Sequence, residues 1–218
     1  MNLIRQNLLS LAAVLALFLL SAILYPDLPE RVVVGFDYEG QVTTLRSRLL
    51  AVFQLPGLYL LVLVLIHGLM RVMPEKFAMP NSKRAMDIIL GGIGVMFCFL
   101  HFGLLGNNGE FDFFVTWFSF GMGCSLIIIG NVFGKTERNF LFGVRTPWSI
   151  ASSQNWKATH RLMGKLMVVV GIVLTVSSLL YANLLLTIVL TVSTLVIPVV
   201  YSLIYYLRFE QGLSNAEE

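Results

Sequence analysis

Long apolar runs separated by short polar segments dominate the pattern of this chain. The runs predict helices at about residues 8–24, 49–70, 86–105, 113–133 and 166–181, and a last helix that follows Ala182-Asn183 and ends near residue 207. An apolar stretch of about 18 or more residues can cross a bilayer as a helix. The pattern therefore predicts an all-α, polytopic integral membrane protein with six transmembrane helices.

The composition supports this class and adds an orientation. Hydrophobic residues make up 57% of the chain and charged residues only 12%, whereas a soluble domain has about 25% charged residues. Twelve of the 15 Lys and Arg residues fall in segments that six spans place on one side. Cytoplasmic loops collect Lys and Arg, so both termini are predicted to be cytoplasmic. The same bias accounts for the net charge of +3, and no direct nucleic acid binding is expected.

The first polar segment, residues 25–48, is predicted to face outward and to be structured. Pro26 and Pro29 end the first helix, because proline has no backbone donor. Val32-Val33-Val34 favours a short strand, and Asp37-Tyr38-Glu39-Gly40 is typical of a turn. We therefore expect a small folded unit between the first two spans.

The second polar segment, residues 134–165, is predicted to be cytoplasmic. Thr146 before Pro147 resembles a helix N-cap followed by proline at the first helical position. Beside this turn, Arg145 carries a guanidinium fork that suits a phosphate or a carboxylate. This segment is the first candidate for specific binding.

A second short helix is expected to begin at Ser152 or Ser153 and to end near residue 163. Its apolar face would carry Trp156 at headgroup depth, with basic side chains near lipid phosphates. Positive-inside bias alone also explains these charges, so a plain membrane anchor is an equal alternative.

Catalytic and metal-binding patterns are missing from the sequence. Cys98 and Cys124 fall inside predicted spans and form no metal-binding pattern. His160 has no carboxylate near it in sequence apart from Glu137, which favours a polar contact over catalysis. No enzyme activity, metal or cofactor is therefore expected. His67 and His101 lie near opposite ends of their spans, and we expect neutral, hydrogen-bonded histidines there.

The residues in the second polar segment resemble a known family. Residues 139–148 read NFLFGVRTPW, and a serine, W-x-x-T-H-R and a glycine follow. This run resembles the signature of SdpI-type membrane proteins. The segment's candidate binding residues are then Asn139, Gly143, Arg145, Thr146, Pro147, Trp148, Trp156, Thr159, His160, Arg161 and Gly164.

The first polar segment is similar to a module of unknown function that is often fused ahead of SdpI-type domains. Tyr25-Pro26-Asp27-Leu28-Pro29 and Phe36-Asp37-Tyr38-Glu39-Gly40 carry this resemblance. Gly35 stands where a histidine is common, and Asp37 where an asparagine is common. The two resemblances predict an N-terminal module at residues 1–75 and an SdpI-like module at residues 76–218.

The resemblance implies a bacterial inner-membrane immunity protein. Such a protein protects its host from a secreted peptide toxin and holds a small transcriptional repressor at the membrane when toxin is bound. Membrane lipids, the toxin and the repressor are the implied partners. The outer segment would then meet the toxin through Asp27, Glu30, Arg31, Phe36, Asp37 and Glu39.

Two alternative functions make different structural predictions. A small exporter of peptide or lipid predicts a polar cavity lined by His67, His101, Thr175, Ser177 and Asn183. A membrane enzyme acting on lipid or cell-wall precursors predicts a cleft where His160, Arg145 and Arg161 meet an acidic residue.

Overall fold

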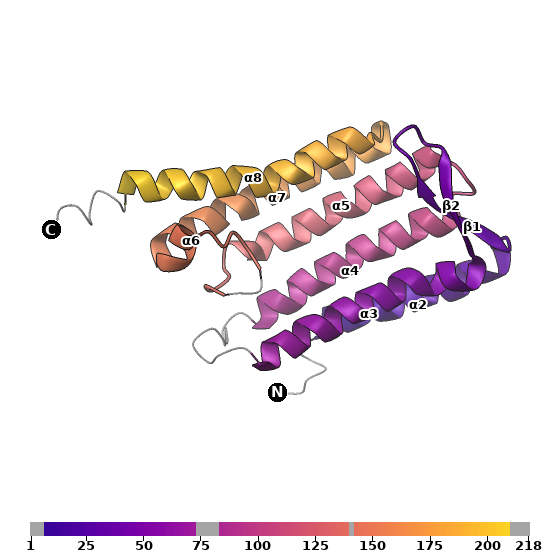
Figure 1. Ribbon diagram of the computed structural model, residues 1–218, viewed down its shortest axis with the longest axis horizontal. Helices are drawn as coiled ribbons and strands as arrows, with labels where there is room; N and C mark the ends of the chain where they lie inside the picture. Colours follow the sequence, from indigo (N-terminus) through magenta and orange to yellow (C-terminus); the bar gives the residue numbers. More distant parts are fainter. Residues whose placement is uncertain (1–6, 73–82, 140–141, 210–218) are drawn as a thin grey trace.

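The computed structural model describes residues 7–72, 83–139 and 142–209 (Figure 1). Within these residues, 6 helices are long and apolar enough to cross a membrane. They are α2 (Leu8–Leu24), α3 (Arg48–Val72), α4 (Lys83–Gly106), α5 (Phe111–Phe133), α7 (Ser153–Leu180) and α8 (Leu184–Phe209). The prediction of an all-α, polytopic membrane protein is confirmed.

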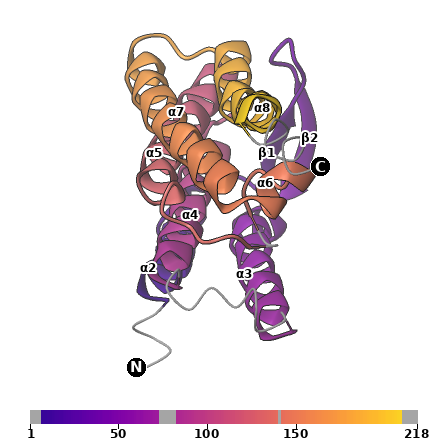
Figure 2. The same ribbon diagram turned by 90° about the vertical axis from the view of Figure 1, so that its left-hand side faces the viewer.

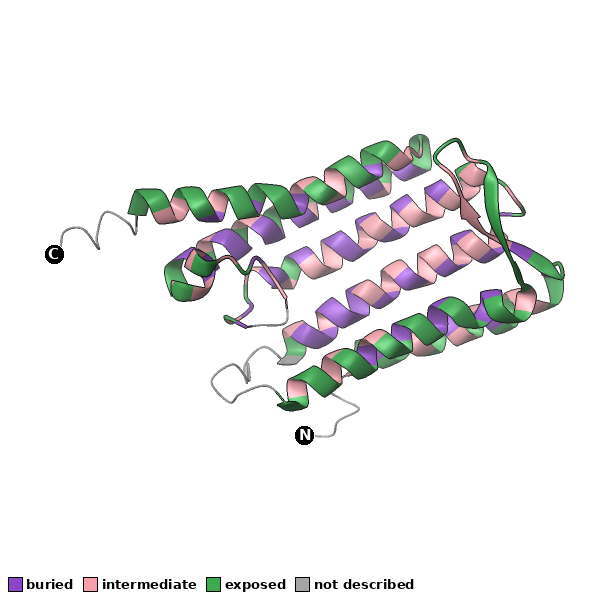
Figure 3. Ribbon diagram, in the orientation of Figure 1, coloured by how far each residue is buried: buried purple, intermediate pink, exposed green. Residues whose placement is uncertain are grey.

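Helix α4 is the central element of the bundle. On one side it packs with α2 and α3 around Leu17, Tyr59 and Leu90. On the other side it packs with α5 and α7 around Leu126 and Leu174. In the most apolar stretch of α4, 50% of the residues are buried inside the bundle, compared with 17% in the corresponding stretch of α8. The outer faces of α3 and α8 are exposed (Figure 3) and suit contact with lipid.

Helices α5 and α7 approach each other closely because glycines face each other across the contact. A Cβ added at Gly130 would lie 2.7 Å from the carbonyl oxygen of Gly164, and the reverse distance is also 2.7 Å. Gly123 and Gly171 repeat this arrangement further along the same two helices, where a Cβ added at either glycine would lie 2.7 Å from the carbonyl oxygen of the other. Small residues allow such backbone approach in membrane helices, so these four glycines let α5 and α7 pack backbone against backbone.

The first polar segment forms a β-hairpin at one end of the bundle. A 3-10 turn, η1 (Tyr25–Asp27), leads into β1 (Arg31–Phe36), which pairs antiparallel with β2 (Val42–Ser47). Gly40 has a φ of +83° in the connecting turn, a conformation that glycine adopts readily. The expected strand and turn are confirmed, whereas β2 is an element that the sequence pattern did not indicate.

The two ends of the bundle separate the polar segments as the sequence predicted. The start of α2, the end of α8 and the short helix α6 (Pro147–Ala151) lie at one end, and the hairpin lies at the other (Figure 1). Which end faces the cytoplasm remains a prediction. The proposed module boundary between residues 75 and 76 lies outside the described residues.

One expectation about the second polar segment is wrong. Residues 153–180 form a single 28-residue helix, α7, rather than a short interfacial helix followed by a span that begins near residue 166. Ser152 caps it, since its side chain accepts a hydrogen bond from the Asn155 N–H. No proline separates the polar turns from the apolar ones. The helix therefore runs on without a break, and Trp156 packs inside the bundle rather than on a lipid-facing surface, with 1% of its surface exposed.

Candidate functional site

His160 lies at the centre of the motif segment, residues 134–165, and is fully buried, with 0% of its surface exposed. The Val144 N–H donates to His160 Nε2 at 3.1 Å. His160 Nδ1 lies 2.8 Å from the Trp156 carbonyl oxygen. Because Nε2 accepts, Nδ1 carries the proton and donates to that carbonyl. The imidazole is therefore neutral and both of its nitrogens are occupied.

Two aromatic rings hold the His160 imidazole between them. The Trp156 ring stacks on it with a centroid separation of 3.9 Å, and the Phe133 ring lies on it at 5.6 Å. The Trp156 Nε1–H in turn donates to the Thr136 carbonyl oxygen at 3.0 Å. These contacts fasten the turn that follows α5 to the first turns of α7.

Gly143 is where the chain passes directly over His160. Its φ is +106°, and a Cβ added there would collide with His160 Nε2. Only glycine fits both the backbone conformation and the space. Asn139 shapes the approach to this point, because its Oδ1 accepts from the Phe142 N–H at 2.9 Å.

The Thr-Pro turn starts α6 as the sequence predicted. Thr146 accepts a hydrogen bond from the Ser149 N–H at 3.3 Å, and Pro147 is the first helical residue. Ser149, which is completely buried, donates to the Val144 carbonyl oxygen at 2.7 Å. The turn that carries Arg145 is thereby fixed from both sides.

Ser202 on α8 joins this turn to the bundle. Trp148 Nε1–H donates to Ser202 Oγ at 2.9 Å, and Thr146 Oγ1 lies 3.3 Å from the same atom. Asn155 Nδ2 donates to the Ser202 carbonyl oxygen at 3.0 Å, and Thr159 Oγ1 donates to Asn155 Oδ1 at 3.0 Å. Helix α6 accordingly lies against both α7 and α8 (Figure 2).

Most of the predicted motif residues thus hold the segment together rather than face solvent. Asn139, Trp156, Thr159, His160 and Gly164 are buried, whereas the arginines of the motif and Pro147 are exposed. Sequence reasoning missed Asn155 and Ser202, and it used Ser149 only as part of the family resemblance, not as a binding candidate. The spacing of four residues between Asn155 and Thr159 on a helix is a signal that could have identified Asn155. Ser202 is a single serine in an apolar helix, and the sequence around it does not indicate which residues it contacts.

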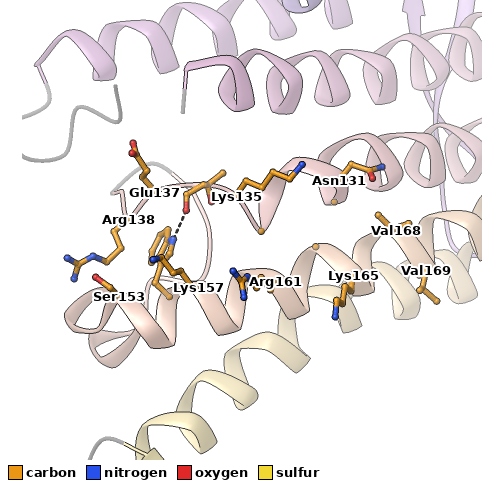
Figure 4. A pocket seen from close by; sticks show the side chains of 15 residues that line it. Asn131, Lys135, Glu137, Arg138, Ser153, Lys157, Arg161, Lys165, Val168 and Val169 are labelled. Atoms are coloured by element: carbon orange, nitrogen blue, oxygen red, sulfur yellow. Dashed lines mark hydrogen bonds between the residues drawn. The ribbon is translucent and has the colours of Figure 1, made fainter. Parts of the chain in front are cut away.

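A wide groove lies along the outer side of α7, between it and the end of α5. Its volume is about 1060 Å³. The basic side chains that line it are Lys135, Arg138, Lys157, Arg161 and Lys165. We call it the basic groove (Figure 4). Among the described residues, Glu137 is its one acidic lining residue.

Three of these cations follow one another along α7 at intervals of four residues. Lys157, Arg161 and Lys165 are all exposed, and their side chains form no hydrogen bond or ion pair within the described part of the chain. Like charges at this spacing destabilise a helix by about 0.2–0.5 kcal/mol per pair. The row therefore costs stability unless an anion lies beside it.

Arg145 is exposed at the edge of a second, apolar pocket of about 560 Å³. The pocket lies among α4, α5, α7 and α8, and Ile93, Phe142 and Met167 contribute to its walls. The structure therefore places Arg145 and Arg161 at different pockets. The cleft that the enzyme hypothesis requires, with His160 beside both arginines and an acid, does not form among the described residues.

The hairpin divides the predicted outer residues into two groups. Phe36 packs on Phe111 and Phe114, with ring centroids 5.4 and 5.5 Å apart. Asp37 Oδ1 accepts from the N–H groups of Glu39 and Gln41 at 2.9 and 2.8 Å and so shapes the turn. The remaining predicted side chains are exposed, namely Asp27, Glu30, Arg31 and Glu39.

The polar residues expected of a transporter are not brought together. His67 Nε2 bonds Asn7 Oδ1 at 2.9 Å near one end of the bundle, and His101 Nε2 bonds Ser21 Oγ at 2.8 Å near the other. Thr175 and Ser177 donate to carbonyl groups of their own helix. Asn183 Oδ1 accepts from the Leu186 N–H at the start of α8. These side chains share no cavity in the described structure.

An additional buried carboxylate links α4 to α2. Asp87 accepts from the N–H groups of Leu9 and Ser10 at 3.2 and 3.1 Å and from Ser10 Oγ at 3.0 Å. A carboxylate at a helix N-terminus satisfies free donors and interacts favourably with the helix dipole. Asp87 is therefore a structural cap rather than part of an ion pathway.

Comparisons with known proteins agree with these observations. Residues 135–202 match the SdpI/YfhL protein family, and residues 12–60 match a domain of unknown function, DUF1648. The chain is 29% identical over 208 residues to the protein named Immunity protein SdpI of Bacillus subtilis (strain 168), covering 93% of this chain and 96% of that protein. No solved structure matches the chain significantly. This chain is a multi-pass cell-membrane protein in which a segment similar to DUF1648 precedes a segment similar to the SdpI/YfhL family.

Proposed function

We propose that this protein confers immunity to a secreted peptide toxin at the cell membrane. The observation that carries the proposal is the end-to-end similarity to a protein named as an immunity protein, 29% identity over 93% of this chain. Two structural features support a non-enzymatic role. Both nitrogens of His160 are occupied inside the bundle, and the motif residues are joined to one another by hydrogen bonds.

The hairpin is the proposed site of toxin contact, with both termini on the cytoplasmic side. Strand β2 is exposed along its whole length, and its outer edge is open to an extended peptide that would add as a third strand. The exposed Asp27, Glu30 and Glu39 present negative charge around it, which favours a basic toxin. Arg31 lies at the start of β1, where it would contact an acidic group of the peptide.

The motif segment is the proposed face for a small transcriptional repressor. Its buried residues fix the backbone, so that Arg145 and Pro147 are presented on a rigid turn. Helix α4 physically connects the two ends of the protein. Leu105 packs under the hairpin, and Ile89 packs in the cluster that includes Val144 of the motif segment. Toxin binding at the hairpin would therefore reach the motif segment through α4.

A survival assay tests the immunity role. Toxin-sensitive cells that express the protein are expected to survive toxin treatment. A D27N/E30Q/E39Q variant is expected to protect poorly, whereas a D112N/E110Q variant, altered at the neighbouring α4–α5 turn, is expected to protect fully. Equal protection by both variants would remove the hairpin from toxin recognition, and no protection by the unaltered protein would refute the immunity role.

A localisation assay tests the repressor role separately. A tagged candidate repressor is expected to move to the membrane only when toxin is present. Arg145→Ala is expected to abolish this movement without affecting survival. Recruitment that persists in this variant would show that the Arg145 turn is not the contact.

A further inference from the structure

We infer that the basic groove binds the headgroup of an anionic phospholipid. The inference goes beyond the proposed immunity function, since it requires neither toxin nor repressor. It begins with the charge of the groove, where five basic side chains line one depression and Glu137 is the one acidic lining residue within the described chain. An anion is the ligand that relieves this repulsion.

The order of residues along α7 indicates an amphiphile rather than a small free anion. Lys157, Arg161, Lys165 and Val169 follow at intervals of four residues and form a row that winds slowly around the helix, by about 40° per step. All four are exposed and line the groove or its end. The row changes from cationic to apolar along its length. A phospholipid whose phosphate lies beside the cationic part would place its acyl chains along the valines.

The opposite wall is positioned for the same ligand. Lys135 and Asn131 lie across from the row of basic residues on α7, and Val168 and Val169 lie at its apolar end (Figure 4). The Thr136 carbonyl oxygen is held by Trp156 Nε1 at 3.0 Å, which fixes the turn that carries Lys135. Arg138 is anchored by hydrogen bonds to the carbonyl oxygens of Ile150 and Ala151 at 3.1 and 3.2 Å. These hydrogen bonds fix the wall of the groove that carries Lys135 and Arg138.

Size and location favour a lipid over free phosphate. The volume of about 1060 Å³ is much larger than inorganic phosphate needs. The groove lies where α5 ends and where α7 changes from polar to apolar residues, and this is the headgroup level of a helix that crosses a bilayer. Basic residues at that level attract anionic lipids.

The test measures binding of fluorescently labelled phosphatidylglycerol to the purified protein in a neutral detergent. The variant K157Q/K165Q removes two groove charges and leaves the motif residue Arg161 in place. Its control, R71Q/R208Q, removes two exposed charges from the last turns of α3 and α8, outside the groove. We expect K157Q/K165Q to bind about 30-fold more weakly, as for two ordinary basic contacts with an anionic lipid, and the control to bind normally. K157R/K165R keeps both charges and should bind like the unaltered protein.

Further measurements distinguish an anionic lipid from a free anion and from a protein partner as the ligand of the groove. Phosphatidylcholine with the same label should bind weakly, because its cation offsets its phosphate, and excess inorganic phosphate should not displace phosphatidylglycerol. Equal binding of both lipids, or equal binding by K157Q/K165Q and the control, would overturn the inference. Displacement by inorganic phosphate would assign the groove to a free anion. Unchanged lipid binding combined with lost repressor recruitment in K157Q/K165Q would assign it to a protein partner.

Discussion

His160 holds the motif segment together through its hydrogen bond from the Val144 N–H and its stacking on Trp156, and these contacts lead to a quantitative prediction. In His160→Ala, the buried Val144 N–H loses its acceptor, which costs about 1–3 kcal/mol. Loss of the stacking on Trp156 adds about 0.5–1.5 kcal/mol, and the cavity left by the ring adds a further contribution. The total is on the order of 4 kcal/mol in the free energy of unfolding. His160→Phe keeps the stacked ring and loses the acceptor, so about 2 kcal/mol is expected.

Thermal unfolding in detergent measures both effects. The 2 cysteines of the chain, Cys98 and Cys124, are partly buried in α4 and α5, so a thiol-reactive fluorophore reports their exposure on unfolding. For a chain of this size, 1 kcal/mol shifts the midpoint by about 2–4 °C. His160→Ala should therefore lower the midpoint by roughly 8–16 °C and His160→Phe by roughly 4–8 °C.

His67→Phe is the matched control. His67 is only partly buried near the end of α3, and water can replace its contact with Asn7, so a change of about 1 kcal/mol or less is expected. The reasoning fails if His160→Ala behaves like His67→Phe. It also fails in part if His160→Phe is fully stable, because the hydrogen bond from Val144 would then contribute nothing.

Three further predictions concern other contacts. Gly143→Ala combines a positive φ of +106° with a collision against His160. It should therefore lower the free energy of unfolding by at least about 2 kcal/mol in the same assay. Gly57→Ala is its control and should not lower stability in this way, because a Cβ added there meets nothing within 4 Å. Ser202→Ala leaves Trp148 Nε1–H and Thr146 without their partner and should cost about 1–3 kcal/mol, while Ser193→Ala, which loses a bond only to its own helix at Leu190, should be nearly neutral; similar losses in both would contradict the joining role of Ser202. In a background without Cys98 and Cys124, Tyr38→Cys on the hairpin should react with an impermeant maleimide in intact cells and Lys157→Cys only after permeabilisation, and the opposite pattern would reverse the proposed orientation.

Local sequence determined much of the fold. The apolar runs located α2, α3, α4, α5 and α8 to within a few residues, because a helix that faces lipid needs only length and apolarity. Proline and the turn residues located the first hairpin strand and its turn. The Thr146-Pro147 pair correctly located the start of α6, since capping depends on neighbours along the chain.

The tertiary structure decided what the motif residues do. An amphipathic face that carries Trp156 and His160 has the same pattern whether it lies on a membrane surface or inside a bundle, and only the close approach of α5 at Gly130 places it inside. Ser202 lies 54 residues from Trp148, so no local pattern could pair them. The sequence determined which residues are unusual in this chain, and the packing of α5, α7 and α8 decided that most of them fix the segment while a row of exposed basic residues remains to bind.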